Sequence, residues 1–144
     1  MAGSLDEWHP SEIKNRKSEI YHYLAPNFCA MTVYGIKNCN TVKKALDWLK
    51  ENNIEFEFHD YKTKGISESK LKEWSKQVGW ESLVNKKGTT WRQLEDEVKD
   101  KVTNQTEAIS LMKDKTSVIK RPLIEQDGKV LTLGFDEQTY SKAF

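Results

Sequence analysis

The sequence predicts an α/β domain, and three features of its pattern support this fold class. Near the start of the domain, a β-prone run, an amphipathic helix and a second alternating run form a strand–helix–strand unit of about 30 residues, the size of a parallel crossover. Several helical patterns follow. Asp127-Gly128 then lies between two apolar runs, which indicates a β-hairpin, and one more helix closes the chain.

The composition is that of a single globular domain. The chain has 144 residues, of which 37% are hydrophobic and 31% charged, and its aromatic side chains can supply a core. A net charge of +1 gives no reason to expect strong binding to nucleic acid or an acidic membrane. No apolar run approaches the ~20 residues that cross a bilayer, and the first thirty residues do not resemble a signal peptide. We therefore expect a cytoplasmic protein, and we find no metal-ligand spacing.

Residues 1–30 differ from the rest of the chain because they are polar and irregularly patterned. Within them, residues 11–24 could form one short helix. We interpret 1–30 as an N-terminal extension outside the core, non-native or flexible, and place the domain at residues 31–144. The alternative is a native arm that packs on a partner or on the domain itself.

The strand–helix–strand unit opens this domain. Residues 31–35 form the first predicted strand, and a loop leads to Thr41, the expected N-cap of a helix that ends at Asn53. Residues 54–61 alternate between apolar and polar types and form the second strand, on which His59 is expected to be a solvated or edge residue. A right-handed connection would make the two strands parallel.

Capping residues and glycines divide the middle of the chain into short helices. The predicted segments are a helix between Ser67 and Gly79, a short helix or turn over 80–85, a helix capped by Thr89 or Thr90 that includes Val98, and a helix around 108–112. After the hairpin, Asp136 is the expected N-cap of the final helix.

Cys39 lies between the first strand and the first helix, a position that favours a reactive thiol. The free amides and the dipole of a helix N-terminus stabilise an anion, so the pKa of Cys39 should fall below the free value of ~8.5. Lys37, Lys43 and Lys44 would add positive charge nearby. The same arrangement can hold an oxyanion. The alternative is a small buried cysteine without reactivity.

Lys120-Arg121-Pro122 is the second sequence feature with chemical meaning. The tripeptide stands where a strand is predicted to begin, and X-Pro bonds are the usual place for a cis peptide. A cis bond would turn the Arg121 backbone toward the opening of the domain. Spacing alone favours the alternative, a trans proline at a strand edge and a solvated arginine.

Four motifs, in order, carry a family resemblance. They are Val-Tyr-Gly-Ile-Lys-Asn-Cys-Asn-Thr-Val-Lys-Lys-Ala, Phe-His-Asp-Tyr-Lys, Gly-Trp-Glu-Ser-Leu-Val-Asn-Lys-Lys-Gly-Thr-Thr-Trp-Arg and Ile-Lys-Arg-Pro-Leu. The pattern resembles the arsenate reductase-related (ArsC) family, which also contains the Spx-type regulators, and above all its YffB-type branch. The resemblance implies a thioredoxin-like mixed β-sheet flanked by helices, with a helical subdomain inserted at about 67–115. It also implies a cis Arg121-Pro122 bond that faces Cys39.

The resemblance also implies roles for individual residues. Cys39 matches the thiol that attacks arsenate, and Arg121 matches an anion-binding arginine next to the cis proline. The residues implied to bind substrate or anion are Arg121, Pro122, Lys43, Thr41 and Asn40.

Two other arginines of true arsenate reductases are replaced here, by Asn85 and Gly134. Neither residue can supply the bidentate fork that suits a tetrahedral oxyanion, which argues against arsenate reduction. Arg92 is a further source of charge, although its spacing is better explained by a solvated helix residue.

The sequence offers no internal partner for the Cys39 thiol in the usual place. Val42 stands three residues after Cys39, so there is no Cys-x-x-Cys motif. Cys29 is separated from Cys39 by a strand that spans roughly 15 Å, whereas a disulfide needs Cα atoms within ~7 Å. Cys29 could act only if the extension folded back. We expect a monothiol mechanism with a second thiol such as glutathione as co-substrate, and no bound cofactor.

These observations predict a thiol-dependent reductase with a single nucleophilic cysteine, acting on a disulfide or an oxyanion. The alternative is a Spx-like, non-enzymatic redox sensor that binds a transcription partner such as RNA polymerase. Spx-type proteins usually carry Cys-x-x-Cys, which places this alternative second. A third interpretation is a glutathione-binding protein without turnover.

Overall fold

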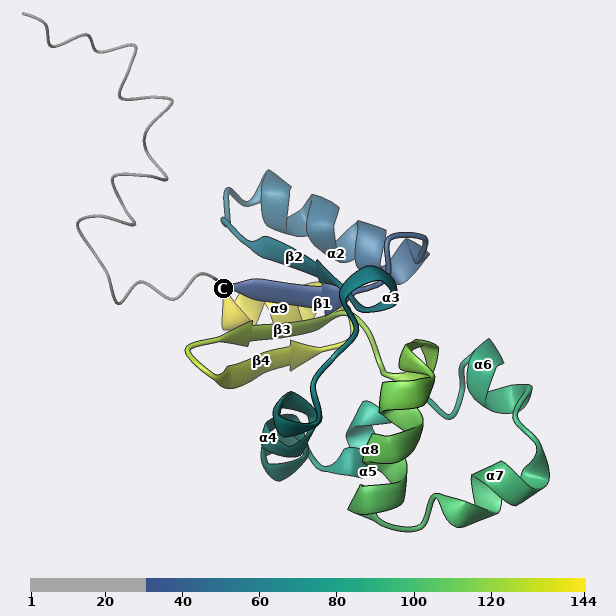
Figure 1. The fold of residues 1–144 in the computed structure, drawn as a ribbon. Coiled ribbons are helices and arrows are strands. Elements are labelled where there is room, and N and C mark those ends of the chain that lie inside the picture. The colour runs from purple at the N-terminus through teal and green to yellow at the C-terminus, as the bar shows by residue number, and fades with distance from the viewer. Residues whose placement is uncertain (1–30) are drawn as a thin grey trace, which may run out of the picture.

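The structure, a computed structural model, describes residues 31–144 (Figure 1). The helix predicted over 11–24 and any role of Cys29 lie outside these residues. The elements are β1 (Thr32–Gly35), α2 (Asn40–Glu51), β2 (Glu57–Asp60), α3 (Tyr61–Lys64), α4 (Glu68–Val78), α5 (Trp80–Leu83), α6 (Thr89–Arg92), α7 (Asp96–Lys101), α8 (Gln105–Asp114), a 3₁₀ turn at Thr116–Val118, β3 (Leu123–Gln126), β4 (Lys129–Leu133) and α9 (Glu137–Ala143).

The strands form one mixed sheet in the order β2-β1-β3-β4. β1 and β2 are parallel, with α2 as the crossover, and β1 pairs with β3 in the antiparallel sense. β3 and β4 form the predicted hairpin, in which Asp127 has φ 54° and Gly128 has φ 76°. Positive φ at both positions is the geometry of the two-residue turn that Asp-Gly favours. The predicted α/β fold with a mixed sheet is confirmed.

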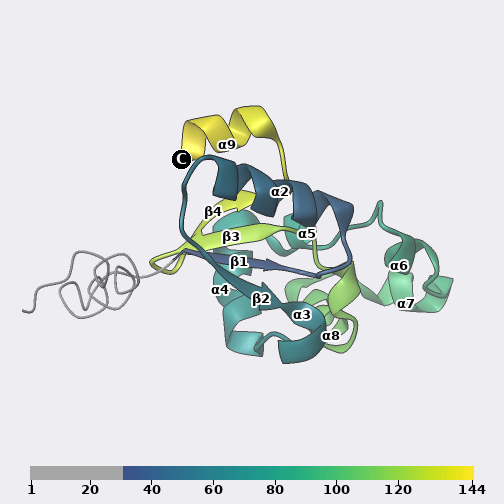
Figure 2. The same ribbon diagram turned by 90° about the horizontal axis from the view of Figure 1, so that it is seen from above.

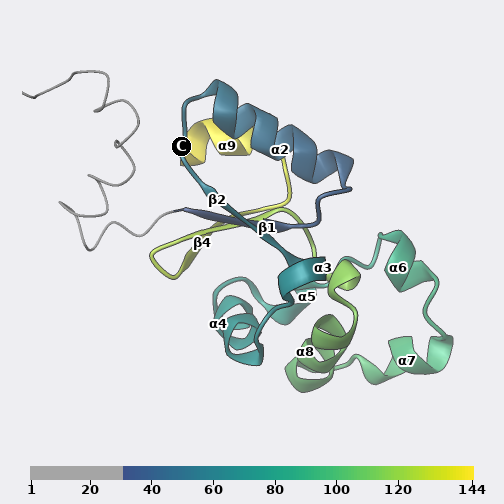
Figure 3. The same cartoon turned by 45° about the horizontal axis from the view of Figure 1, so that its top comes forward.

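Helices cover the sheet on both faces. α2 and α9 lie together on one face, and α4, α5 and α8 lie on the other (Figures 2 and 3). The strand residues alternate accordingly, since neighbouring side chains of a strand point to opposite faces. The core under α2 and α9 contains Met31, Val33, Ala45, Leu49, Ile124 and Tyr140.

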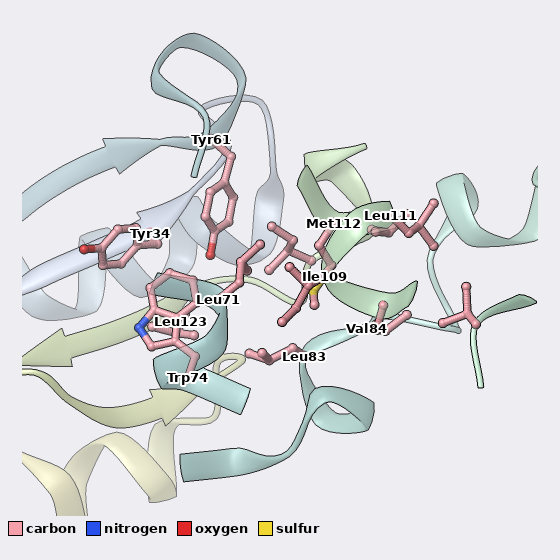
Figure 4. Packing of buried hydrophobic residues seen from close by; sticks show 14 of the residues in the cluster. Tyr34, Tyr61, Leu71, Trp74, Leu83, Val84, Ile109, Leu111, Met112 and Leu123 are labelled. Carbon is pink, nitrogen blue, oxygen red and sulfur yellow. The ribbon is translucent and has the colours of Figure 1, made fainter. Parts of the chain in front are cut away.

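The opposite face carries the larger core, which joins the sheet to the helices inserted between β2 and β3. Tyr34 and Leu123 contribute from the strands, and Leu71, Trp74 and Met112 from the inserted helices (Figure 4). These three side chains are fully buried. The insert is therefore an integral layer of the fold.

A buried carboxylate links the insert to the sheet. Glu125 on β3 is only 7% exposed, and it accepts hydrogen bonds from Lys70 Nζ at 2.9 Å and from Trp74 Nε1. Both donors come from α4. Since a buried charge is tolerated only when it is paired, this contact fixes α4 against the strand that follows Arg121.

Several predicted element boundaries were wrong. The first helix ends at Glu51 rather than Asn53, and Gly88, not Thr89 or Thr90, is the N-cap of α6. Thr41 does not cap α2, because the helix begins at Asn40 and Cys39 is its N-cap. The second strand is confined to Glu57–Asp60, since the Asp60 side chain accepts a hydrogen bond from the Lys62 amide and starts α3. His59 lies on an edge strand as predicted, but it is half-buried, and its Nε2 is 2.7 Å from the carbonyl oxygen of Gly65.

The helix predicted to include Val98 is in fact two helices, α6 and α7. The Leu94 amide donates to the carbonyl oxygen of Trp91, which closes a turn, and Glu95 is extended with ψ 147°. Asp96 and Glu97 then occupy the first turn of α7, where acidic side chains favour a new helix start.

By contrast, the caps of other helices agree with the sequence. Ser67 accepts from the Lys70 amide at the start of α4, and Gly79 ends that helix with φ 84°. Asp136 accepts from the Thr139 amide at the start of α9.

Candidate active site

A close approach between β1 and α2 sets the position of Cys39. β1 ends at Gly35, where an added Cβ would lie only 2.8 Å from Cγ2 of Val42. Val42 is 1% exposed, so it has little room to move away. Glycine therefore allows the first turn of α2 to rest against the end of the strand, with Cys39 as the residue that opens the helix.

Cys39 is in an extended conformation with φ −120° and ψ 120°, and its side chain is partly exposed. The sulfur makes no capping hydrogen bond, so the amides of the first helical turn are available to an anion. Partial burial of the sulfur raises the pKa of Cys39. The Val42 amide, the Arg121 guanidinium and the Thr41 amide outweigh burial, and together they hold that pKa below its ordinary value.

Arg121 is held from behind by carbonyl groups. Its Nη1 donates to the carbonyl oxygens of Ser117 at 2.8 Å and Ile119 at 3.4 Å, and the Arg121-Pro122 peptide bond is cis, as the resemblance implied. Nε is buried without a partner among residues 31–144. The carbonyl groups thus fix the guanidinium in place next to the thiol.

The insert positions the segment that carries this arginine. The Asn85 amide donates to the carbonyl oxygen of Val118 at 2.7 Å, and the Lys120 amide donates to that of Leu83, also at 2.7 Å. Val84 and Ile119 form an isolated antiparallel bridge between the same two segments. The backbone leading into Arg121 is therefore fixed by α5 and the residues that follow it.

A pocket of about 300 Å³, a volume at the small end of ligand-binding cavities, has Arg121 and Thr41 in its wall. Cys39 itself does not line it and is connected to it through these two residues, whose guanidinium and amide act on the sulfur. The pocket is lined by Thr41, Asn85, Lys120, Arg121, Leu133, Gly134, Phe135, Asp136 and Thr139. These residues come from the start of α2, the segment after α5, the segment before β3, and the β4–α9 connection with the first turn of α9.

Asn85 and Gly134, which the resemblance implies to stand in place of two arginines, are both in the wall of this pocket. Asn85 contributes from the segment after α5, and Gly134 from the end of β4. The Gly134 amide donates to the carbonyl oxygen of Pro122 at 2.8 Å, and its φ is 88°. The pocket therefore lacks two cations at the places where the resemblance puts them in arsenate reductases.

The residues predicted from the sequence fall into two groups. Thr41 and Arg121 line the pocket, and the buried Pro122 supports the arginine. Asn40, at the first position of α2, and Lys43 are exposed and do not line it.

Arg92 is also exposed, on α6, and likewise does not line the pocket. Its backbone carbonyl oxygen accepts from Lys99 Nζ at 3.2 Å, and its side chain makes no hydrogen bond or ion pair within residues 31–144. The anion-binding roles of Asn40, Lys43 and Arg92 stay predictions.

Sequence reasoning missed two charged residues of the pocket, Lys120 and Asp136. The sequence places Lys120 in the motif around Arg121 and predicts Asp136 as a helix cap, and neither role indicates a pocket. Hydrogen bonds from the amide and the hydroxyl of Thr139 lower the pKa of Asp136, so its carboxylate is ionised at neutral pH. Only the fold shows that the two charges share one cavity.

Two further observations bear on the kind of site. Among residues 31–144, no three histidine, cysteine or acidic side chains gather in a way that could hold a metal ion. Within the same residues, no helix has the length and apolarity to span a membrane.

The fold agrees with the comparison to known proteins. A family model described as the ArsC family matches residues 34–143, and the chain belongs to that family. An uncharacterized protein of Haemophilus influenzae is 50% identical over 114 residues, which cover 79% of this chain and 98% of the relative. A solved structure described as a YffB protein is 40% identical, with a TM-score of 0.73, and covers 78% of this chain and 97% of that one.

A more distant relative is the global transcriptional regulator Spx of Lactiplantibacillus plantarum. It is 26% identical over 107 residues, which cover 73% of this chain and 79% of the regulator. The predicted family is thereby confirmed, and the predicted YffB-type and Spx-type relatives are both found.

Proposed function

We propose that the protein is a thiol-dependent reductase in which Cys39 is the single nucleophile and glutathione is the second thiol. The observation that carries this proposal is the set of donors around one sulfur. The Val42 amide and the Arg121 guanidinium lower the pKa of Cys39 despite its partial burial. A thiolate is the nucleophilic form of cysteine, so this environment favours attack.

The proposed reaction is a pair of thiol–disulfide exchanges. The Cys39 thiolate attacks one sulfur of a disulfide, a bond forms between the two sulfurs, and the other half leaves as a thiolate that takes up a proton. Glutathione, as its thiolate, then attacks the sulfur bonded to Cys39 and forms a new disulfide with it. The Cys39 thiolate is regenerated, and one disulfide has been exchanged for another at the expense of one glutathione thiol.

Arg121 supports both exchanges by stabilising negative charge. Its guanidinium favours the Cys39 thiolate before the first attack and again when that thiolate leaves in the second. The pocket next to it can hold the half of the disulfide that stays bound to Cys39.

Disulfides fit this site better than arsenate does. Asn85 and Gly134 line the pocket where the resemblance would place two more arginines, and Asp136 adds a negative charge to the same wall. An arsenate dianion would meet that carboxylate without the bidentate arginines that could offset it.

A Spx-like binding role is the second candidate, and the similarity to the Spx regulator favours it. In that case Cys39 would act as a redox sensor, and the protein would bind a transcription partner such as RNA polymerase. The lone Cys39, with Val42 in place of a second cysteine, supports the reductase instead.

The test compares the wild type with Cys39→Ser and Cys29→Ser, using glutathione with bis(2-hydroxyethyl) disulfide, and arsenate in parallel. We expect disulfide turnover in the wild type and in Cys29→Ser, loss of turnover in Cys39→Ser, and no arsenate reduction. Equal turnover in the wild type and Cys39→Ser would reject the proposal. Loss of turnover in Cys29→Ser would reject the single-thiol mechanism.

A further inference from the structure

The pocket that contains Arg121 and Thr41, both of which act on Cys39, carries two opposite charges that the proposed exchange reaction does not use. Lys120 and Asp136 both line it, whereas Arg121, the third charged residue of the wall, acts on the thiol. A site meant only for an anion would have no use for the carboxylate. Lys120 and Asp136 are both exposed to solvent and line the same pocket without pairing with each other, so each is available to one charge of a ligand.

The carboxylate of Asp136 has one oxygen occupied and one available. Oδ2 accepts from both the amide and the hydroxyl of Thr139, each at 2.8 Å. Oδ1 has no hydrogen-bond partner within residues 31–144. An ionised carboxylate with an unused oxygen is an acceptor for an ammonium group.

The ammonium of Lys120 is also available. Its backbone is fixed, because its amide donates to the carbonyl oxygen of Leu83. Its side chain passes close to Gly134, since a Cβ added to that glycine would lie 3.5 Å from Cε of Lys120. Its Nζ forms no ion pair within residues 31–144, so it can pair with a carboxylate of the ligand.

The rest of the wall suits a compact organic group. Leu133 and Phe135 contribute apolar surface, and Asn85 and Thr139 contribute neutral polar groups. The volume of about 300 Å³ admits a group the size of a single amino acid rather than a folded protein surface.

We propose that this pocket selects disulfides whose retained half is an amino-acid-type zwitterion, with its carboxylate at Lys120 and its ammonium at Asp136. The inference rests on the proposed exchange at Cys39, and it adds the chemical class of the half that stays bound after the first attack. The sulfur of that half is bonded to Cys39, and its charged end lies between the two side chains. Lys120 and Asp136 are thus specificity-determining residues.

Four mixed disulfides of similar size test this inference. Each joins 2-nitro-5-thiobenzoate, which is coloured when it leaves, to one of cysteine, cysteamine, 3-mercaptopropionate or 2-mercaptoethanol. These retained halves are zwitterionic, cationic, anionic and neutral. The rate of 2-nitro-5-thiobenzoate release is measured in a single turnover, with excess protein and no glutathione. To correct for the intrinsic reactivity of each disulfide, this rate is divided by the rate at which free 2-mercaptoethanol cleaves the same disulfide.

We expect the wild type to react with the cysteine disulfide about three- to tenfold faster, after normalisation, than with any of the other three. Lys120→Gln should remove the preference for the cysteine half over the cysteamine half. Asp136→Asn should remove the preference over the 3-mercaptopropionate half, and asparagine preserves the helix cap. Lys129→Gln and Asp47→Asn remove the same charges from exposed positions outside the pocket and should keep the wild-type preference.

The outcomes separate this inference from the proposed function. Equal normalised rates for all four disulfides, with release still dependent on Cys39, would overturn the inference and leave the reductase intact. The same would follow if Lys129→Gln or Asp47→Asn changed the preference as much as the pocket variants do. Release that is unchanged in Cys39→Ser would reject both.

Discussion

Gly35→Ala should destabilise the protein and also make Cys39 less acidic. The new Cβ would lie 2.8 Å from Cγ2 and 3.2 Å from Cγ1 of Val42, against an optimal carbon–carbon separation of about 3.5–4.0 Å. Val42 or the end of β1 must therefore shift by about 1 Å. Since Val42 is 1% exposed, the shift disturbs a packed core, and overpacking of this kind costs about 1–3 kcal/mol.

The same shift would move a donor of the thiol site. The Val42 amide is among the groups that lower the pKa of Cys39, so its displacement should raise that pKa toward the ordinary value. Urea unfolding measures the free energy of unfolding, and the rate of alkylation against pH measures the pKa.

The double variant Gly35→Ala/Val42→Ala is the matched control, because truncation of Val42 removes both methyl groups that the new Cβ would meet. The Gly35→Ala change should cost less in the Val42→Ala background than in the wild type, which a double-mutant cycle detects. If Gly35→Ala is as stable as the wild type and Cys39 keeps its pKa, the account of how β1 positions the helix is refuted.

Two further predictions concern the charges of Arg121 and of the Lys70–Glu125 pair. Arg121→Met should raise the pKa of Cys39 and slow the alkylation of Cys39 at neutral pH. The control Arg92→Met removes an exposed arginine outside the pocket and should change neither the pKa nor the alkylation rate. Equal effects of the two variants would disprove a local action of Arg121. Burial alone would lower the pKa of Lys70, but the charge and the hydrogen bond of Glu125 outweigh burial and raise that pKa. The ion pair therefore stabilises the fold below the unfolded-state lysine pKa of about 10.4, and this stabilisation is lost as the pH rises through the higher folded-state pKa. The free energy of unfolding from urea titrations should therefore fall at alkaline pH, with a smaller fall in Lys70→Met than in the exposed-site control Lys72→Met; identical slopes would contradict the coupling.

Local signals made much of the fold predictable. Ser67 and Gly79 bracket a helix because a hydroxyl can accept from a first-turn amide and glycine adopts positive φ without penalty. Asp127-Gly128 gives the hairpin for a related reason, since both residues tolerate positive φ.

The wrong boundaries have a common physical cause, which is competition between local preferences. Thr41 was favoured as a cap because of its hydroxyl, but Gly35 lets the helix approach the strand closely, and the helix starts earlier, at Asn40 after Cys39. Around Leu94, the sequence predicts one helix where the structure has two, α6 and α7, because the apolar spacing continues across the break between them.

The site itself was only half predictable. Cys39 and Arg121 follow from motifs whose chemistry is local, a helix N-terminus and an arginine before proline. Lys120 and Asp136 give no such signal, because their shared role depends on a pocket formed by segments that are far apart in the sequence. Charge partners across a fold are set by tertiary structure, which no local pattern encodes.

The distribution of the site along the chain has a consequence for synthesis of the protein. Arg121 follows Cys39 by 82 residues (121 − 39), and Asp136 comes later still. A growing chain therefore exposes its sulfur well before it has made the guanidinium that favours the thiolate. Until the C-terminal segments have been translated and have docked, Cys39 lacks that partner, and its full acidity is acquired only as the last part of the domain folds.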